Sequence, residues 1–408
     1  MSEAGERGPV PRPALERLTG IPTAVFSRDY WGERPLLTRH PSGFDDLFSA
    51  AAVDELVAHR ALRTPFVRMA VEGKVLSSSL FTGSGGFGAE VADQLDSAAV
   101  LEQFAAGATL VLQGLHRTWE PIATFTRRLI ADLGHPAQVN AYITPASSRG
   151  FDPHYDTHDV FVIQIAGEKR WTIHEPVHTH PLADQPWTDH ADAVAARATT
   201  APEIDAVFAP GDVLYLPRGW IHSAVAQGGT SIHLTIGVRA ATRHDLLLRL
   251  LAPAGDDPTL RRPLALGLDG ADAAVLDADI AATVAAARSL LDDAAADGAV
   301  AEALHSAFRS ATRPAPVRPL ATVDLLADLG PGVVLGWRDA LRGRIEDDDR
   351  HVRIVLPRKT ITLPAEASAA VHALRTADHA AGALPGLDPE SSLTVSRRLL
   401  REGVLVPR

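Results

Sequence analysis

Short apolar runs broken by Gly, Pro and Asp fill the chain from about residue 20 to residue 240. They include "ATLVLQGL" (108–115), "AQVNAYIT" (137–144), "DVFVIQIAG" (159–167), "KRWTIHEP" (169–176), "DVLYLPRG" (212–219) and "SIHLTIGV" (231–238). Runs of this length, alternating or continuously apolar, indicate strands, and several of them at close spacing predict an antiparallel barrel or sandwich. One segment, "EPIATFTRRLIADLG" (120–134), has helical spacing and predicts a helix that ends at Gly134.

The pattern becomes helical between about residues 244 and 312, where Ala and Leu recur at helical spacing. The segment "TRPAPVRPLA" (312–321) reads as a proline-stiffened linker. Beyond it, "HVRIVLPRKTITLPAEA" (351–367) predicts one or two strands, two helical segments follow, and Asp388 or Ser391 is a candidate cap of the second. We therefore expect domains at 1–243, 244–318 and 319–408, the last resembling a winged helix.

The composition limits which metal sites and binding partners the chain can have. The chain has 408 residues and no cysteine, so iron–sulfur clusters, disulfides and cysteine-ligated zinc are excluded and a metal would need His, Asp or Glu. The net charge of −11 argues against bulk binding to nucleic acid or anionic membranes. The start, "MSEAGERGPVPRPALERL", has no apolar core typical of a signal peptide, and no apolar run reaches about 18 residues. We expect a cytoplasmic protein.

Ionisable side chains precede the strand pattern in "GFDPHYDTHDVFVIQIAGEKRW" (150–171). His154 and Asp156 are two residues apart, and in an extended chain such residues project to the same side. His222, at the start of a later strand, is the best third ligand. Two His and one carboxylate match the facial triad of non-heme Fe(II) oxygenases. A zinc hydrolase could use the same ligands, but its helical H-E-x-x-H is absent.

Lys169 lies just after a Gly-containing turn predicted at Gly167–Glu168, which would let the next strand fold back and point Lys169 into the barrel. Arg170 alternates to the opposite face. A buried lysine needs an anionic partner, and the distal carboxylate of 2-oxoglutarate would supply it.

These motifs, with "FSRDYWGERPLL" (26–37), "NAYITPASSRG" (140–150) and "FAPGDVLYLPRGWIHSAV" (208–225), resemble the JmjC-type 2-oxoglutarate oxygenases of the cupin-4 branch, which includes the ribosomal oxygenases. The resemblance implies a mainly β fold with α elements: a double-stranded β-helix (JmjC/cupin barrel), a helical dimerisation region that makes homodimers, and a winged-helix-like domain. It implies Fe(II) on His154, Asp156 and His222 and 2-oxoglutarate on Lys169. It also implies Asn140 near the cosubstrate and Tyr142 facing the substrate.

Two positions depart from the family pattern. Thr157 and His158 follow the carboxylate, and Gly237 stands where some relatives carry a substrate-contacting serine. We expect His158 to line the substrate cleft or to be structural. His233 is either a core residue or a neighbour of the iron. His174, His178 and His180 could form a metal cluster, but their proline-containing context predicts a surface loop.

One further motif, "GSGGFG" (83–88), satisfies the glycine pattern of dinucleotide sites, but no alternation of strands and helices surrounds it. We expect a loop near the mouth of the active site.

The resemblance therefore implies an Fe(II)- and 2-oxoglutarate-dependent oxygenase that hydroxylates a protein side chain, an Arg or His of a ribosomal protein. The alternatives are a hydroxylase that tailors a peptide natural product and a non-catalytic cupin-like binding protein. A nucleic-acid-binding regulator is disfavoured by the acidic total.

Overall fold

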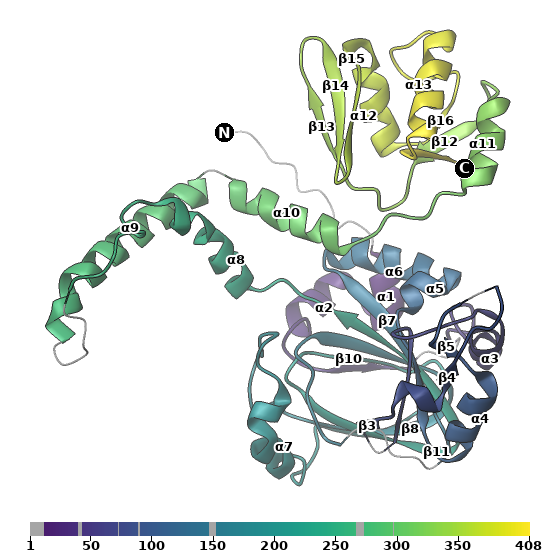
Figure 1. Cartoon of the computed structure of the whole chain (residues 1–408), viewed down its shortest axis with the longest axis vertical. Coiled ribbons are helices and arrows are strands. Elements are labelled where there is room, and N and C mark those ends of the chain that lie inside the picture. The colour runs from purple at the N-terminus through teal and green to yellow at the C-terminus, as the bar shows by residue number, and fades with distance from the viewer. Residues whose placement is uncertain are drawn as a thin grey trace. The chain divides into compact units, whose positions relative to one another are not determined.

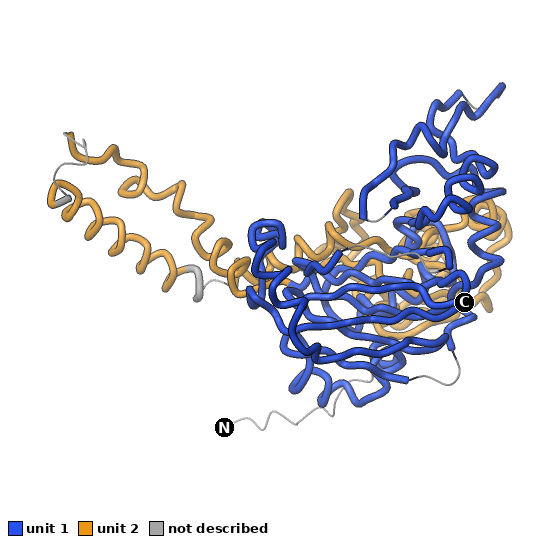
Figure 2. The backbone as a smooth tube through the Cα atoms, turned by 90° about the horizontal axis from the view of Figure 1, so that it is seen from below, with its two compact units in different colours: residues 1–240 blue, residues 241–408 orange. Residues whose placement is uncertain are grey.

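The computed structural model describes residues 12–39, 43–71, 73–88, 90–146, 152–266, 273–296 and 298–408. Residues 147–151 of the family motif and the first eleven residues lie outside these ranges. The chain forms two compact units, residues 1–240 and 241–408 (Figure 2). This division lies close to the boundary predicted after residue 243, while the boundary predicted after residue 318 separates no compact units and stays a prediction.

A nine-stranded sheet is the framework of the first unit. Its order is β1-β10-β8-β11-β7-β6-β2-β3, and β9 pairs with β8. The strands are β1 (Leu36–Thr38), β2 (Val67–Val71), β3 (Lys74–Val75), β6 (Thr109–Leu112), β7 (Ala137–Thr144), β8 (Asp159–His174), β9 (Ile204–Phe208), β10 (Val213–Leu216) and β11 (Ile221–Val238). The sequence pattern located all of the long ones.

The strands β8 and β11 pair along their whole length, which corrects the predicted turn at Gly167–Glu168. The chain does not fold back after Gly167: β8 continues to His174. The ladder changes register twice, between Gln227 and Ile232 and again between Ile232 and His233 of β11, opposite residues 164–168 of β8. Gly167 has a φ of 61°, so it forms a glycine bulge instead of a turn.

The bulge reverses which side chains face inward. Before it, Val160 and Val162 line a cavity inside the folded sheet, and after it Lys169 and Trp171 line the same cavity. Strict alternation would place even and odd positions on opposite faces. The irregular segment of β8 between Gln164 and Glu168, which contains Gly167, is therefore what brings both halves of β8 to one cavity, and it places Lys169 inside as expected.

Helices cover the outer face of the sheet (Figure 1). Phe161 and Ile163 of β8 and Tyr215 of β10 pack there with Leu18 and Leu129 in one core. In α6 the predicted end at Gly134 is confirmed, since Gly134 adopts the left-handed conformation with a φ of 71°. The helices of this unit are α1 (Pro13–Thr19), α2 (Thr23–Asp29), α3 (Ala50–His59), α4 (Ser97–Ala105), α5 (Leu115–Thr118), α6 (Glu120–Leu133) and α7 (Ala191–Arg197).

The second unit begins with helices, as predicted, and ends in a module of helices and two small sheets, ordered β16-β12-β17 and β13-β14-β15. Asp388 caps α13, where its carboxylate accepts hydrogen bonds from the amides of Glu390 and Ser391. The helices are α8 (Arg243–Leu250), α9 (Asp277–Ala296), α10 (Ala299–Ala311), α11 (Pro319–Ala327), α12 (Ser368–Thr376) and α13 (Pro389–Arg401). The strands are β12 (Val334–Trp337), β13 (Arg344–Asp347), β14 (His351–Leu356), β15 (Lys359–Pro364), β16 (His379–Ala380) and β17 (Leu405–Pro407).

No helix in the described ranges is both long enough and apolar enough to cross a bilayer. The "GSGGFG" segment is not followed by a helix at its described end: strand β4 (Thr82–Gly83) pairs with β5 (Gln94–Leu95) across it. The dinucleotide interpretation is therefore unsupported by its surroundings.

The bulge gives a stability prediction. A Cβ at Gly167 would lie 2.1 Å from the carbonyl oxygen of Thr230, whereas a Cβ at Gly228, which also has a positive φ, meets nothing within 4 Å. We expect Gly167→Ala to lower the free energy of unfolding by about 3–5 kcal/mol and Gly228→Ala by about 1–2 kcal/mol, the cost of the left-handed backbone alone. Urea unfolding followed by tryptophan fluorescence measures both; equal losses would show that close packing against Thr230 is not important.

Candidate active site

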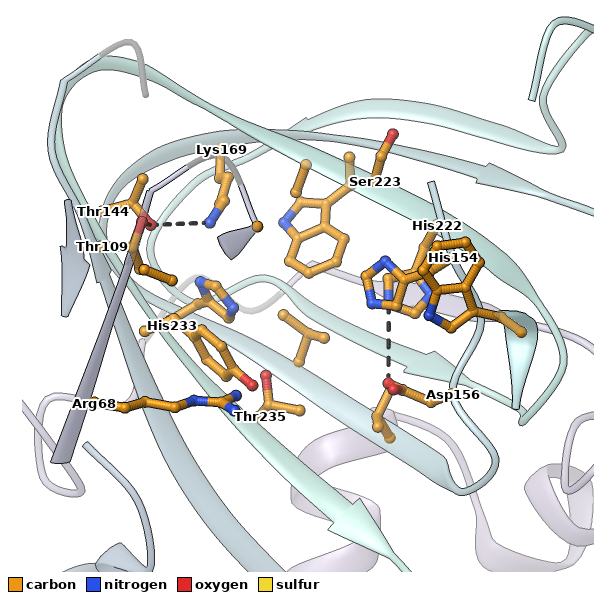
Figure 3. Close-up of a pocket in the computed structure, with 18 residues that line it drawn as sticks. Arg68, Thr109, Thr144, His154, Asp156, Lys169, His222, Ser223, His233 and Thr235 are labelled. Atoms are coloured by element: carbon orange, nitrogen blue, oxygen red, sulfur yellow. Dashed lines mark hydrogen bonds and ion pairs between the residues drawn. The ribbon is translucent and has the colours of Figure 1, made fainter. Parts of the chain in front are cut away.

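Three predicted ligands lie together at one end of the cavity (Figure 3). His154 and His222 exchange backbone hydrogen bonds in an isolated bridge, and their ring centroids are 4.4 Å apart. The His222 Nε2 atom lies 3.9 Å from Asp156 Oδ2. Two donor atoms that bind one ion at about 2.0–2.2 Å lie about 3–4 Å apart, so this spacing fits a shared ion.

The rings are oriented by carbonyl groups. Nδ1 of His154 lies 2.7 Å from the Asp152 carbonyl oxygen, and Nδ1 of His222 lies 3.1 Å from that of Trp220. When Nδ1–H donates to a carbonyl, the lone pair of Nε2 is left to bind a metal, which is the usual arrangement of metal-ligating histidines.

Electrostatics favour the protonation states that metal ligands need. Burial and the neighbouring His154 lower the pKa of His222 to about 4, so its imidazole is neutral at pH 7. Burial alone would raise the pKa of Asp156, but His222, His158 and His154 outweigh it and hold that pKa below its usual range. Neutral imidazole with ionised carboxylate is the donor set of a metal site.

The side chains of His154, Asp156 and His222 do not yet converge on one metal position. No three His, Asp or Glu side chains in the described part of the chain already surround one metal position. His154, Asp156 and His222 are neighbours that would have to turn toward a common point to share an ion. The Asp156 carboxylate has room to move, since its side chain is 33% exposed.

Lys169 lies at the other end of the cavity and is 3% exposed. Its Nζ donates to Thr144 Oγ1 at 3.2 Å, and Thr109 Oγ1 is 3.5 Å from the same oxygen. Burial lowers the pKa of Lys169 to about 8. In the described part of the chain its only polar partner is this hydroxyl, so the ammonium has no counterion there.

The aromatic side chains of Trp171 and His233 lie between the His, Asp, His cluster and Lys169. Trp171 contacts the His233 ring edge-on with centroids 5.4 Å apart, and it lies 6.2 Å from the His222 ring. The Trp171 Nε1 and His233 Nδ1 atoms are buried and have no hydrogen-bond partner in the described structure. Buried polar groups without partners are uncommon in proteins, so these atoms mark a place for a polar ligand.

The cavity encloses about 300 Å³, within the range of small-ligand sites. The lining residues that sequence reasoning missed come from several elements: Arg68, Thr109, Thr144, Trp171 and Trp187. Of these, Arg68 had a visible signal, because it is the single charged residue within the apolar run "VRMAV" (67–71).

The remaining predicted residues have varied surroundings. Tyr142 lines the cavity and stacks on His233 with ring centroids 5.0 Å apart. The Asn140 side-chain oxygen accepts a hydrogen bond from the Gly114 amide, and Asn140 is not among the lining residues, so its contact with a cosubstrate stays a prediction.

His158 lies against Gly237, where a Cβ would come within 2.8 Å of its ring atoms. The absence of a side chain at Gly237 therefore makes room for the imidazole of His158, close to Asp156.

The histidine-rich segment is only partly a surface loop. His178 and His180 follow the prediction, but His174 is the buried last residue of β8, 4% exposed, which contradicts it. The strand reaches His174 and ends before Pro176, because β8 pairs with β9 up to Ile173 and with β11 up to His174. Arg170 points outward as predicted and forms an ion pair with Asp205 at 2.6 Å.

Comparisons with known proteins agree with this geometry. The sequence pattern of the JmjC domain matches residues 116–246. The chain is 37% identical over 129 residues to the bifunctional lysine-specific demethylase and histidyl-hydroxylase NO66 of Drosophila erecta, a match covering 31% of this chain and 19% of that protein. It is 30% identical over 226 residues to ribosomal oxygenase 2 of Rattus norvegicus, covering 54% of this chain and 45% of that protein.

The chain thus spans less than half the length of these curated relatives. A solved structure of YcfD, a ribosomal oxygenase from Escherichia coli, in complex with cobalt and 2-oxoglutarate, matches across 95% of this chain and 98% of YcfD with a TM-score of 0.51 at 18% identity. This likeness shows a shared fold. Residues 116–246 are thus similar to JmjC domains, and the chain is similar to the ribosomal oxygenases.

Proposed function

We propose that the chain is an Fe(II)- and 2-oxoglutarate-dependent oxygenase that hydroxylates a side chain of a protein or peptide. The observation that carries the proposal is the pairing of two features in one cavity: a His, Asp, His cluster at one end and a buried ammonium without a counterion in the described chain at the other. The match to the JmjC domain supports it.

In the proposed reaction, 2-oxoglutarate and O₂ give succinate and CO₂; one oxygen atom enters succinate and the other enters a substrate C–H bond. When bound, iron and 2-oxoglutarate together supply the oxidising chemistry. His154, Asp156 and His222 would hold the metal. Neutral His222 and ionised Asp156, set by the surroundings described above, need no proton release before binding.

Lys169, with the hydroxyls of Thr144 and Thr109, would bind the distal carboxylate of the cosubstrate. A charge-assisted hydrogen bond in a buried site is stronger than one between neutral groups, so this end fixes the orientation of the cosubstrate. Trp171 and His233 would lie along its length, where the Trp171 Nε1–H donor and the His233 Nδ1 atom lack partners in the described structure. Val160 and Val162 keep the same wall apolar and exclude water.

The substrate proposal is a ribosomal protein, because relatives of this chain are named ribosomal oxygenases. Tyr142 and His158 would contact it. Such a substrate places the enzyme in the cytoplasm.

The second unit would support assembly. Leu246, Leu247 and Leu248 of α8 and Ile280 and Val284 of α9 are exposed, and exposed apolar helix faces favour self-association. We propose that α8–α10 pair two copies into a homodimer, and that the C-terminal module, a winged-helix-like domain, docks the substrate.

Removing a metal ligand tests the first end of the cavity. We expect Asp156→Ala and His222→Ala each to weaken Co(II) binding by at least about 100-fold and to abolish 2-oxoglutarate turnover, since a three-ligand site loses a donor. Titration calorimetry and succinate detection by NMR measure these. His178→Ala, in a loop outside the lining residues, is the control. Unchanged metal affinity in both cavity variants would refute the ligand assignment.

The pH dependence of cosubstrate binding tests the other end. Without a ligand, Lys169 loses its proton near its pKa of about 8, and the anion binds only the protonated form. We therefore expect the affinity for 2-oxoglutarate to be constant below this pH and to fall about tenfold per pH unit well above it. Lys169→Arg should flatten the profile and Lys169→Met should weaken binding about 10- to 100-fold. A wild-type affinity that is constant up to pH 9.5 would contradict the role of Lys169.

The ribosomal substrate is tested by intact-mass analysis of ribosomal proteins from cells with and without the gene. We expect one of them to be heavier by one oxygen atom only when the gene is present, and cells expressing Asp156→Ala serve as the matched control. If no ribosomal protein differs in mass, the proposal of a ribosomal substrate is wrong, and a hydroxylase that tailors a peptide natural product becomes the preferred function.

A further inference from the structure

A second basic side chain, Arg68 of β2, lines the cavity that holds the iron ligands and Lys169. The strand register places it in a lateral row with the substrate-facing wall: Arg68 pairs with Val111, which pairs with Tyr142, which pairs with His233. Residues in such a row project to the same face of the sheet. Figure 3 shows the guanidinium of Arg68 reaching into the cavity beside Thr235, away from Lys169.

Arg68 is not neutralised by the described protein. Its Nε atom is buried without a hydrogen-bond partner, and no described carboxylate forms an ion pair with it. Its positive charge is nevertheless felt by Tyr142, whose pKa is raised by burial and lowered in part by Arg68. The Tyr142 hydroxyl is a neutral acceptor beside Arg68, but a buried guanidinium without an anionic partner is costly unless a ligand adds further acceptors.

If the proposed function holds, the two ends of the cosubstrate are taken up by the metal and by Lys169, which leaves Arg68 without an anion. A divalent metal and the dicarboxylate cancel each other's charge, and Asp156 cancels Lys169. Among the described lining residues these two and Arg68 are the only charged side chains. The loaded cavity therefore keeps the positive charge of Arg68 next to Tyr142, where the substrate enters.

We infer that Arg68 selects the substrate side chain: the target presents a hydrogen-bond acceptor and carries no positive charge. Imidazole, carboxamide and carboxylate side chains meet this condition, and a guanidinium or ammonium does not. The inference rests on the proposed function and decides between the two target residues considered above, in favour of histidine over arginine. Like charges brought together in a cavity of low polarity repel each other, which excludes a side chain with a positive charge.

Degenerate peptide libraries test the inference without knowledge of the natural target. Each library fixes one central residue, His, Asn, Asp, Arg or Lys, between randomised flanks, and the readout is incorporation of ¹⁸O from labelled O₂ by the full-length enzyme with Fe(II) and 2-oxoglutarate. We expect incorporation with His, Asn or Asp to exceed that with Arg or Lys by at least about tenfold. A leading Arg or Lys library, or no incorporation in any library while 2-oxoglutarate is still turned over, overturns the inference.

Charge reversal gives the specific control. Arg68→Glu should shift the ratio of Arg to Asp incorporation toward Arg by at least about tenfold, and this ratio is independent of any overall loss of activity. The matched control is Arg170→Gln, because Arg170 points out of the cavity and should leave the ratio unchanged. A ratio unaffected by Arg68→Glu, or a larger effect on 2-oxoglutarate affinity than on peptide preference, would assign Arg68 to another role. Failure of the proposed function is distinct: it would show as absence of metal-dependent succinate in every variant.

Discussion

The ladder between β8 and β11, bulged at Gly167, is the constraint on which the candidate site depends. On one side of the bulge the paired strands carry Val160, Val162 and His233 into the cavity, and on the other they carry Lys169, Trp171 and His222. Without the change of register at the bulge, one of these two groups would face the helices instead. The irregularity, which includes a glycine with a positive φ, thus brings Lys169 and His222 into the same cavity as Val160, Val162 and His233.

Several polar and charged groups in the cavity have no ion or counterion as a partner in the described protein. The His, Asp, His cluster has ligand-ready protonation states, while Lys169 and Arg68 have no carboxylate partner in the described chain. In a folded protein such groups are retained where a ligand completes them. In the proposed function a dication binds the His, Asp, His cluster, a dicarboxylate binds Lys169, and a substrate side chain with a hydrogen-bond acceptor binds Arg68. One cavity therefore accounts for the proposed cofactor, cosubstrate and substrate preference.

Much of this site could be predicted from sequence, because His154, Asp156 and His222 lie at strand edges where their residue types have a recognisable spacing. Lys169 was placed correctly for a partly wrong reason, since periodicity shows where alternation breaks but cannot distinguish a tight turn from a bulge. His174 was placed in a loop because its pairing with Ile221 of β11 is a long-range contact that no local pattern reveals. Arg68 and Thr109 were missed for the same reason: their relation to Tyr142 and Thr144 exists only through the register of β2, β6 and β7. Asn140 was predicted to lie near the cosubstrate, but its side-chain oxygen accepts a hydrogen bond from the Gly114 amide.

The most direct measurement is a crystal structure of the protein soaked with Mn(II) and 2-oxoglutarate under exclusion of oxygen. The account predicts one metal ion within about 2.0–2.3 Å of His154 Nε2, an Asp156 oxygen and His222 Nε2. It also predicts the distal carboxylate of 2-oxoglutarate on Lys169 Nζ. A metal ion held elsewhere, or a cosubstrate whose far carboxylate contacts Arg68 in place of Lys169, would contradict it.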